Sequence, residues 1–195
     1  MREAAYQLHL PDERAQLHGL ALDLLESIVA ATPHLADPWA EELAAHAGGA
    51  RRPGLSAAQT LDLETREVAW LRRALAWLYA HARTDRALRV ARALADLSAC
   101  PLDARINALR LGGEAAAMVG DLALAADLLA RACALAGTET NEGRAALRAH
   151  GSVLMRRQQP GQAQAALESC IQACRRHGDE PNLGRALGAL GVLHM

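Results

Sequence analysis

An internal repeat of 38 residues is the feature that most constrains this chain. The pair Leu71-Arg72 recurs as Leu109-Arg110 and again as Leu147-Arg148. Because the repeated apolar positions lie three, four or seven residues apart, each segment presents one buried helix face. Such units cannot bury that face alone, so a stack of helix pairs is expected. The repeated apolar columns are Leu78, Ala116 and Leu154; Ala87, Ala125 and Ala163; Ala91, Leu129 and Leu167; and Leu94, Ala132 and Cys170.

Each unit has the pattern of a helix, a short turn and a second helix. In the second unit the first helix is expected from about Asp103 to Val119, and the second is expected to end near Ala136. Gly120-Asp121 forms the turn between them, because Gly stops a helix and Asp caps the next one. The equivalent turns are Arg83-Thr84-Asp85 and Gln159-Pro160-Gly161, and a further first helix is expected from about Pro181.

The composition agrees with an all-α fold. Hydrophobic residues make up 51% of the chain but aromatic residues only 3%, with no Phe, so Ala and Leu form the core. The net charge is −1, and the chain has no basic tract, which argues against a direct nucleic-acid partner. All 21 cationic side chains are Arg. No apolar run is long enough to span a membrane, and Met1 to Tyr6 open no signal stretch. Four cysteines without a CxxC pair fit a reducing cytoplasm.

The N-terminal segment, residues 1–54, is expected to be helical but outside the repeats, which occupy residues 55–195. Pro11-Asp12-Glu13 begins a helix with acids in its first turn. A short helix capped by Asp37-Pro38 is expected to end near His46, before a linker from Gly48 to Gly54. Ser56-Ala57-Ala58-Gln59 reads as a capping box that opens a long helix toward Ala82. The expected buried face of the first helix is Leu17, Leu20, Leu24, Leu25 and Ile28.

Residues 66–195 resemble the tetratricopeptide repeat (TPR) pattern. Gly113 and Gly151 match the small residue at which the first helix of a unit closely approaches the second. Ala125 and Ala163 match the small residue that opens the second helix, whereas the first unit departs from the pattern with Leu75 in place of the usual Gly. The resemblance implies a TPR-like α-α superhelix of about three and a half units.

A second resemblance involves the N-terminal segment. The run from Leu10 to His18, Leu-Pro-Asp-Glu-Arg-Ala-Gln-Leu-His, is followed later by Glu42-Leu43-Ala44-Ala45-His46. These motifs resemble the helical stretch after the ATPase core of STAND ATPases, including the large ATP-binding LuxR-type transcription activators. The run from Leu71 to Leu78 resembles a phrase common in the TPR sensor of that family. The resemblance implies a sensor arm that binds a small-molecule inducer or a regulatory protein.

In TPR arrays the first helix of each unit lines a concave groove, and the resemblance places Arg72, Arg110 and Arg148 there. Stacked helices lie about 10 Å apart, so these guanidiniums would form a row able to bind carboxylates or phosphates. The alternative is that they are solvated or pair with acids of the chain itself, such as Glu67, Glu114 or Glu142. The same alignment adds further groove residues: Asn107, Glu114, Met118, Ser152, Met155, Arg156 and Arg185.

No motif points to catalysis or to a cofactor. A chain without Lys has no P-loop of the usual kind, and neither GxSxG nor HExxH occurs. Cys170, Cys174 and His177 share one helical stripe and are candidate metal ligands, but Cys170 holds a repeated core position, which favours packing. Trp70 and Trp77 share a face that either packs against the N-terminal helices or stacks on a ligand.

The sequence therefore predicts a non-catalytic protein- or peptide-binding module that acts as a scaffold or a regulatory interaction domain. The alternative is a ligand-sensing fragment of a STAND-type transcription regulator. The helix from Pro181 has no following helix to cover Leu187, Leu190 and Leu193. This face is open to three interpretations: the chain is a fragment of a longer protein, the face mediates self-association or contact with another chain, or it is a plain cap.

Overall fold

The computed structural model describes residues 10–193, and every regular element in that range is a helix. The all-α prediction is therefore confirmed, and no described helix is long and apolar enough to cross a membrane. The opening stretch from Met1 to Tyr6 and the last residue, Met195, lie outside the described range. The elements are α2 (Pro11–Ala31), the 3-10 helix η1 (Pro33–Leu35), α3 (Ala36–Gly49), α4 (Ala57–Ala80), α5 (Thr84–Asp96), α6 (Leu102–Met118), α7 (Leu122–Ala136), α8 (Asn141–Arg156), α9 (Pro160–His177) and α10 (Glu180–Leu193).

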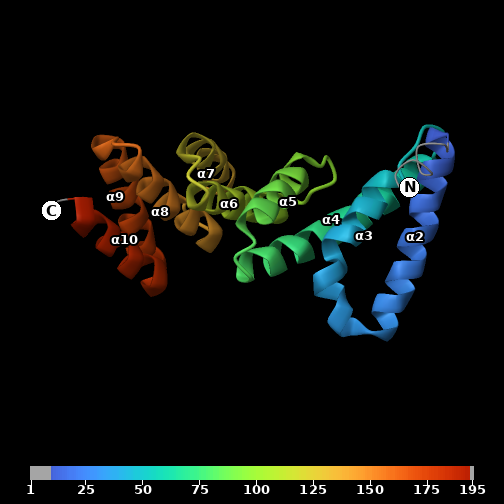
Figure 1. Ribbon diagram of the computed structural model, residues 1–195. Helices are drawn as coiled ribbons and strands as arrows, with labels where there is room; N and C mark the ends of the chain where they lie inside the picture. Colours follow the sequence, from blue (N-terminus) through green and yellow to red (C-terminus); the bar gives the residue numbers. More distant parts are fainter. Residues whose placement is uncertain (1–9, 194–195) are drawn as a thin grey trace.

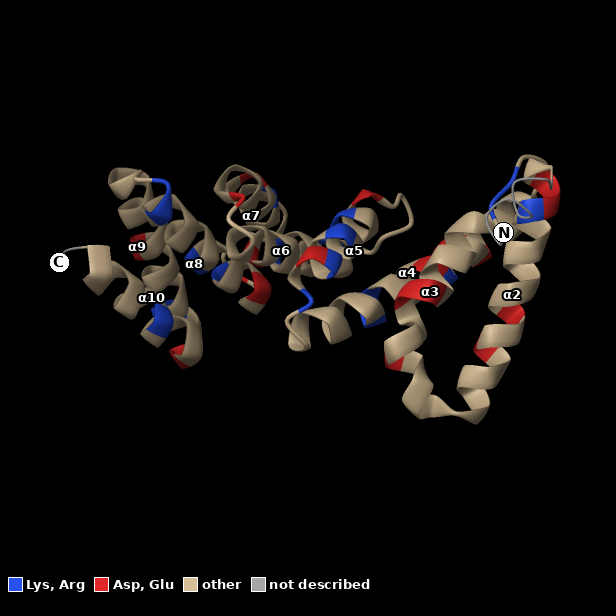
Figure 2. Ribbon diagram, viewed as in Figure 1, with Lys and Arg blue, Asp and Glu red and all other residues tan. Residues whose placement is uncertain are grey.

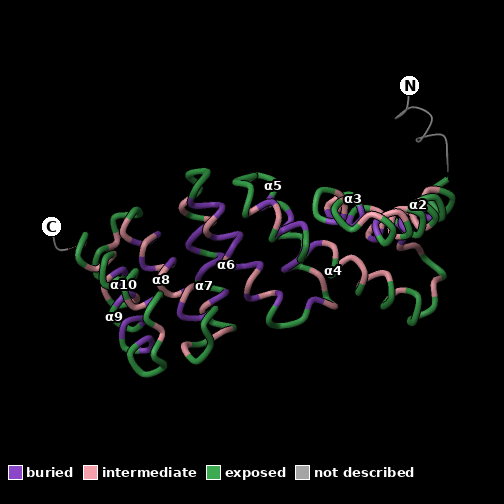
Figure 3. Tube along the Cα trace, turned by 90° about the horizontal axis from the view of Figure 1, so that it is seen from below, coloured by how far each residue is buried: buried purple, intermediate pink, exposed green. Residues whose placement is uncertain are grey.

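Successive helices pack side by side, so the chain progresses from α2 at one end to α10 at the other (Figure 1). The helices α4, α6, α8 and α10 also contact one another in series, whereas α5, α7 and α9 have no comparable contacts among themselves in the described chain. We call α4, α6, α8 and α10 the inner row. Buried residues are concentrated where the two sets of helices meet (Figure 3).

The close approach of paired helices depends on glycine, as predicted for the second and third units. A Cβ placed on Gly113 would lie 2.6 Å from Cγ of Leu129, and one on Gly151 would lie 2.8 Å from Cγ of Leu167. Both leucines are fully buried. Because carbon atoms in contact lie about 3.5–4.0 Å apart, only glycine fits at these two sites.

The first unit solves the same packing problem in the opposite way. Leu75 occupies the position of Gly113, and Ala91 occupies the position of Leu129. Both residues are 1% exposed and belong to one apolar cluster. In the first unit the first helix therefore supplies the large side chain and the second helix the small one, the reverse of the second unit. The combined side-chain volume at the contact stays similar.

The predicted buried face of the first helix is wrong. In α2 the buried residues are Ala15, Leu22 and Val29, spaced seven apart, and they pack toward α3 and α4. Of the five residues predicted to be buried, Leu25 and Ile28 are half-buried, while Leu17, Leu20 and Leu24 are exposed. The error arises because α2 carries two apolar stripes, and helical periodicity alone does not decide which of them meets the core.

The predicted linker is shorter than expected, because α3 begins at Ala36 and continues to Gly49 instead of ending near His46. Gly48 and Gly49 are helical contact sites and not linker residues. A Cβ on Gly48 would lie 2.8 Å from Oε1 of Glu67, and one on Gly49 would lie 2.8 Å from the ring of His18. These glycines let α2 and α4 approach α3 closely.

Other local predictions are confirmed. Ser56 accepts a hydrogen bond from the backbone N–H of Gln59, and the Gln59 side chain accepts from the backbone N–H of Ser56, so α4 opens with a capping box. Asp121 caps α7 by accepting from the backbone N–H of Leu124 at 3.0 Å. The preceding Gly120 has a φ of +91°, a left-handed conformation that glycine adopts without strain. On α10, Leu187 is 44% exposed.

Candidate partner-binding groove

Three neighbouring cavities follow the inner row. The first, of about 620 Å³, lies between α4, α6 and the start of α8 and is lined by Arg72, Asp103 and Asn107. The second, of about 540 Å³, is bounded by residues of all four inner helices. The third, of about 240 Å³, lies between α6 and α8 and shares Glu114 and Arg148 with the second. We call these cavities together the groove.

The groove collects nine of the ten residues that the sequence alignment assigned to a binding surface. Met155 is the exception, because it packs against the apolar cluster of α9 and α10. Among the other nine, Arg72 and Asn107 line the first cavity; Arg110, Glu114, Arg148 and Arg185 line the second; and Glu114, Met118, Arg148, Ser152 and Arg156 line the third. The repeat register therefore places these residues along one continuous surface.

Glu114 is the centre of the charged cluster in the groove. Arg110 Nη1 lies 3.1 Å from Glu114 Oε1, and Arg148 Nη2 lies 3.7 Å from the same oxygen. The Tyr79 hydroxyl donates to the other carboxylate oxygen, while Arg110 Nη2 donates to Asn107 Oδ1 at 2.9 Å. Burial, reinforced by the hydrogen bond to Glu114, raises the pKa of Tyr79 to about 12, so this phenol stays protonated as a donor.

The cluster has more donors than the chain itself satisfies. The Nε atoms of Arg110 and Arg148 are buried and have no hydrogen-bond partner among the described residues. Arg185 is exposed and forms no ion pair within residues 10–193. Three guanidiniums thus line the second cavity together with three carboxylates, of which Glu114 is shared by Arg110 and Arg148, Asp179 pairs with Arg144, and Glu142 lies on the rim. An incoming anion would meet the exposed Arg185 directly, whereas the Nε atoms of Arg110 and Arg148 lie beneath the surface.

Arg72 differs from the other two repeated arginines. It is about half-exposed and pairs with Asp103 at 3.4 Å. Exposed pairs of this kind contribute only about 0–1 kcal/mol, so Arg72 remains available to an incoming anion. Of the three acids proposed as internal partners for the arginine row, only Glu114 takes that role, since Glu67 binds Arg51 at 2.8 Å.

A buried ion pair next to the groove was not found from the sequence. Arg144 Nε and Asp179 Oδ2 are 2.7 Å apart, and both side chains are only 8% exposed. Arg144 also donates to the backbone carbonyls of Thr138 and Glu139, and Asn182 donates to Asp179. Burial by itself would raise the pKa of Asp179, but the hydrogen bonds from Asn182 and Arg144 outweigh it and lower that pKa.

One signal in the sequence does mark this ion pair. Arg144 occupies a repeat position that holds Val68 in the first unit and Ile106 in the second. A charged residue in an otherwise apolar column requires a buried partner. The ion pair fixes the start of α10 against α8, and so it positions Arg185 beside the groove.

The two cysteines on the α9 stripe belong to the hydrophobic core. Cys170 and Cys174 are fully buried, and the Cys170 thiol donates to the backbone carbonyl of Arg144. Burial, with the neighbouring Cys174, raises the pKa of Cys170 to about 12, so the thiol stays protonated. His177 lies 3.1 Å from Glu139 instead of joining the thiols. No group of three potential metal ligands occurs in the part of the chain that the structure describes.

The aromatic side chains are used internally. The Trp70 indole donates to Glu26 at 2.7 Å and packs against the cluster formed by α2 and α3. Trp77 stacks on His81 with ring centroids 4.4 Å apart. Packing toward the N-terminal helices, the simpler of the two sequence interpretations, therefore describes Trp70.

Comparison with known proteins adds no family assignment to this geometry. No protein-family model matches the sequence. No curated protein matches it at a significant level.

Proposed function

We propose that this chain is a non-catalytic binding module with a TPR-like superhelix, and that its groove holds an acidic segment of a partner protein. The observation that carries the proposal is the row of arginines along the groove, in which Arg110 and Arg148 share Glu114, and the exposed Arg156 and Arg185 have no ion pair among the described residues. Because carboxylates accept forked hydrogen bonds from Arg, acidic side chains or a carboxyl terminus match these donors.

The helix arrangement supports the superhelix. Contacts run in series through α4, α6, α8 and α10 but not through α5, α7 and α9. Helices that contact one another on one side and separate on the other produce a curved stack whose inner surface is the closely packed row. The groove lies along that row, so an extended peptide would contact several units at once.

Charge reversal at two exposed groove arginines tests the proposal. The variant Arg156→Glu/Arg185→Glu should bind a fluorescein-labelled peptide of alternating Glu and Ala at least about tenfold more weakly than the wild type, a loss of about 1.4 kcal/mol. Arg110 is left intact, because its removal would leave Glu114 with a single distant cation. Binding is measured by fluorescence anisotropy, with circular dichroism as the check on folding.

The matched control is Arg89→Glu/Arg92→Glu on α5, which makes the same change in net charge at exposed positions outside the groove. It should bind the peptide nearly as well as the wild type. Equal weakening by both variants would mean that the peptide senses only overall charge. Unchanged binding by the groove variant would remove the groove from the proposal.

The volume of the second cavity supports one alternative. Its roughly 540 Å³ lies within the range of about 300–1,000 Å³ that small-molecule sites occupy. We propose as the second candidate that a small dicarboxylate binds there, as expected for a sensor region. Glutarate would then raise the melting temperature of the wild type but not of the Arg156→Glu/Arg185→Glu variant, and it would displace the peptide.

A further inference from the structure

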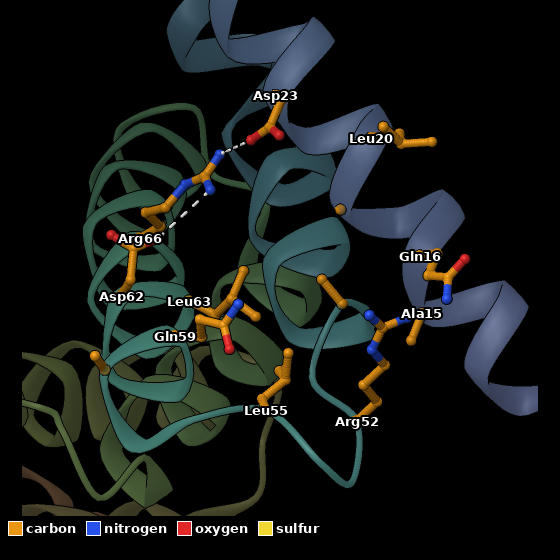
Figure 4. A pocket seen from close by; sticks show the side chains of 13 residues that line it. Ala15, Gln16, Leu20, Asp23, Arg52, Leu55, Gln59, Asp62, Leu63 and Arg66 are labelled. Carbon is orange, nitrogen blue, oxygen red and sulfur yellow. Dashed lines mark hydrogen bonds and ion pairs between the residues drawn. The ribbon is translucent and has the colours of Figure 1, made fainter.

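The N-terminal helices carry an apolar ridge that nothing in the described chain covers. Leu17, Leu20 and Leu24 are 45%, 67% and 62% exposed and lie on one side of α2, three to four residues apart. Figure 4 shows Leu20 on the outer flank of α2, at the edge of a separate cavity between α2 and α4. We call these three residues the leucine ridge. Because its leucines are three and four residues apart on one helix face, a second helix can pack along the ridge.

Hollows on both sides extend the ridge into a wider surface. A cavity of about 680 Å³ separates α2 from α4 and contains Leu55 and Leu63. A second, of about 750 Å³, lies between α2 and α3 and contains Leu25 and Trp39. Both hollows also contain charged side chains, such as Arg52 and Arg66 in the first and Glu42 and Arg86 in the second, so the apolar i, i+3, i+4, i+7 side chains of a docking helix would meet the ridge and its neighbouring leucines.

The same helices are strongly acidic. Residues 10–49, which form α2, η1 and α3 and which we call the arm, contain seven Asp and Glu but only one Arg, in a chain whose net charge is −1. Figure 2 shows these acids on α2 and α3. Arg66, Arg73 and Arg86 of α4 and α5 each bind acids of the arm. With these three arginines counted the net charge of the arm is −3, and with Arg52, which donates to the backbone oxygen of Asp12, it is −2.

We infer that the leucine ridge binds an amphipathic helix of a partner protein whose apolar seam is flanked by Lys or Arg. The ridge requires an apolar seam, and the negative arm selects basic flanks, because opposite charges favour both encounter and register. The exposed acids available to them include Asp12 and Glu42; the latter has only His46 as a neighbour, at 3.5 Å, among the described ion pairs. A second copy of α2 is the disfavoured occupant, because two arms of like charge would then face each other.

A peptide pair and three variants test the inference. The probe is a labelled peptide of three Leu-Lys-Lys-Leu-Ala-Lys-Ala heptads, and its partner has Gln for every Lys, so that it does not also occupy the arginine groove. The full chain should bind the Lys peptide more tightly than the Gln peptide. Leu20→Gln/Leu24→Gln, which removes the ridge without changing charge, should weaken binding at least about tenfold. Asp12→Asn/Glu42→Gln should weaken it by a smaller factor and reduce its dependence on salt.

The control is Leu135→Gln, which alters an exposed leucine on α7, far along the chain from the arm. It should bind like the wild type. The inference is overturned if the Gln peptide binds as tightly as the Lys peptide, or if the ridge variant keeps full affinity while its circular dichroism spectrum is native. It is also overturned if sedimentation shows a wild-type dimer that Leu20→Gln/Leu24→Gln converts to a monomer, since the occupant is then a second copy.

Discussion

Replacing Gly113 by Ala adds one methyl group that has two opposing effects on the free energy of unfolding. In a helix interior Gly→Ala stabilises by about 1 kcal/mol through backbone entropy. Here the new Cβ would lie 2.6 Å from Cγ of Leu129 and 3.2 Å from the carbonyl oxygen of Ala125. Leu129 is fully buried, so its side chain has to shift within the packed core to make room. Overpacking of this kind costs about 1–3 kcal/mol, which exceeds the entropic gain. The net loss in the free energy of unfolding should be about 1–2 kcal/mol.

Thermal unfolding followed by circular dichroism measures the balance. For a chain of 195 residues a loss of 1 kcal/mol lowers the melting temperature by about 2–4 °C, so Gly113→Ala should lower it by about 2–8 °C. Gly188→Ala in α10 is the control, because nothing lies within 4 Å of the position that its new methyl group would take. That variant should instead raise the melting temperature by about 1–4 °C.

The two substitutions should therefore have opposite signs. If Gly113→Ala stabilises as much as Gly188→Ala, the close approach of α6 and α7 does not limit the packing, and the reasoning is refuted. A second test adds Leu129→Ala, which alone should cost about 2–5 kcal/mol. In the double variant the new methyl group enters the space that Leu129 leaves, so the two losses should sum to less than their separate values.

Three other predictions concern buried polar groups. Arg144→Met should lower the free energy of unfolding in urea by about 3–5 kcal/mol by leaving Asp179 buried without its cation, and the added substitution Asp179→Asn should recover much of that loss. Burial and the adjacent His46 lower the pKa of His18 from 6.5, so neutral His18 stabilises the folded state fully above pH 6.5. This stabilisation is lost as the pH falls from 6.5 toward the lower pKa of the folded state. The free energy of unfolding in urea should therefore be smaller at pH 5.5 than at pH 7.5, and equal values would contradict the prediction. The thiol of Cys170, with a pKa of about 12, should react with an alkylating reagent at pH 8 only after unfolding, and peptide mass spectrometry distinguishes it from the other three free thiols.

The repeated units were the predictable part of the fold. Gly120-Asp121 and Ser56 mark helix ends through backbone conformation and capping, which are local properties of the sequence. The predicted second-unit helices agree with α6 and α7 to within a residue at each end. The arm was predicted less well, because the choice between the stripe containing Leu22 and the one containing Leu20 depends on where α3 and α4 lie.

For the groove, the sequence predicted which residues line the surface better than it predicted which residues they bind. Arg110 and Arg148 line the groove because the repeat register fixes the helix face they occupy. That register does not show that both share Glu114, or that Tyr79 from another unit completes the cluster, because these contacts join residues from three helices. The repeat alignment also assigned Met155 to the groove, but its side chain packs against the apolar cluster of α9 and α10.

The exchange of Leu75 and Ala91 for Gly113 and Leu129 makes the half-units non-interchangeable. A chimera that joined α4 directly to α7 would oppose two leucines at one contact, and a chimera that joined α6 to α5 would oppose Gly and Ala and leave a void. Each first helix is thus matched in size to its own second helix. Side-chain volumes thus fix which first helix pairs with which second helix, so exchanging half-units should fail where exchanging whole units succeeds.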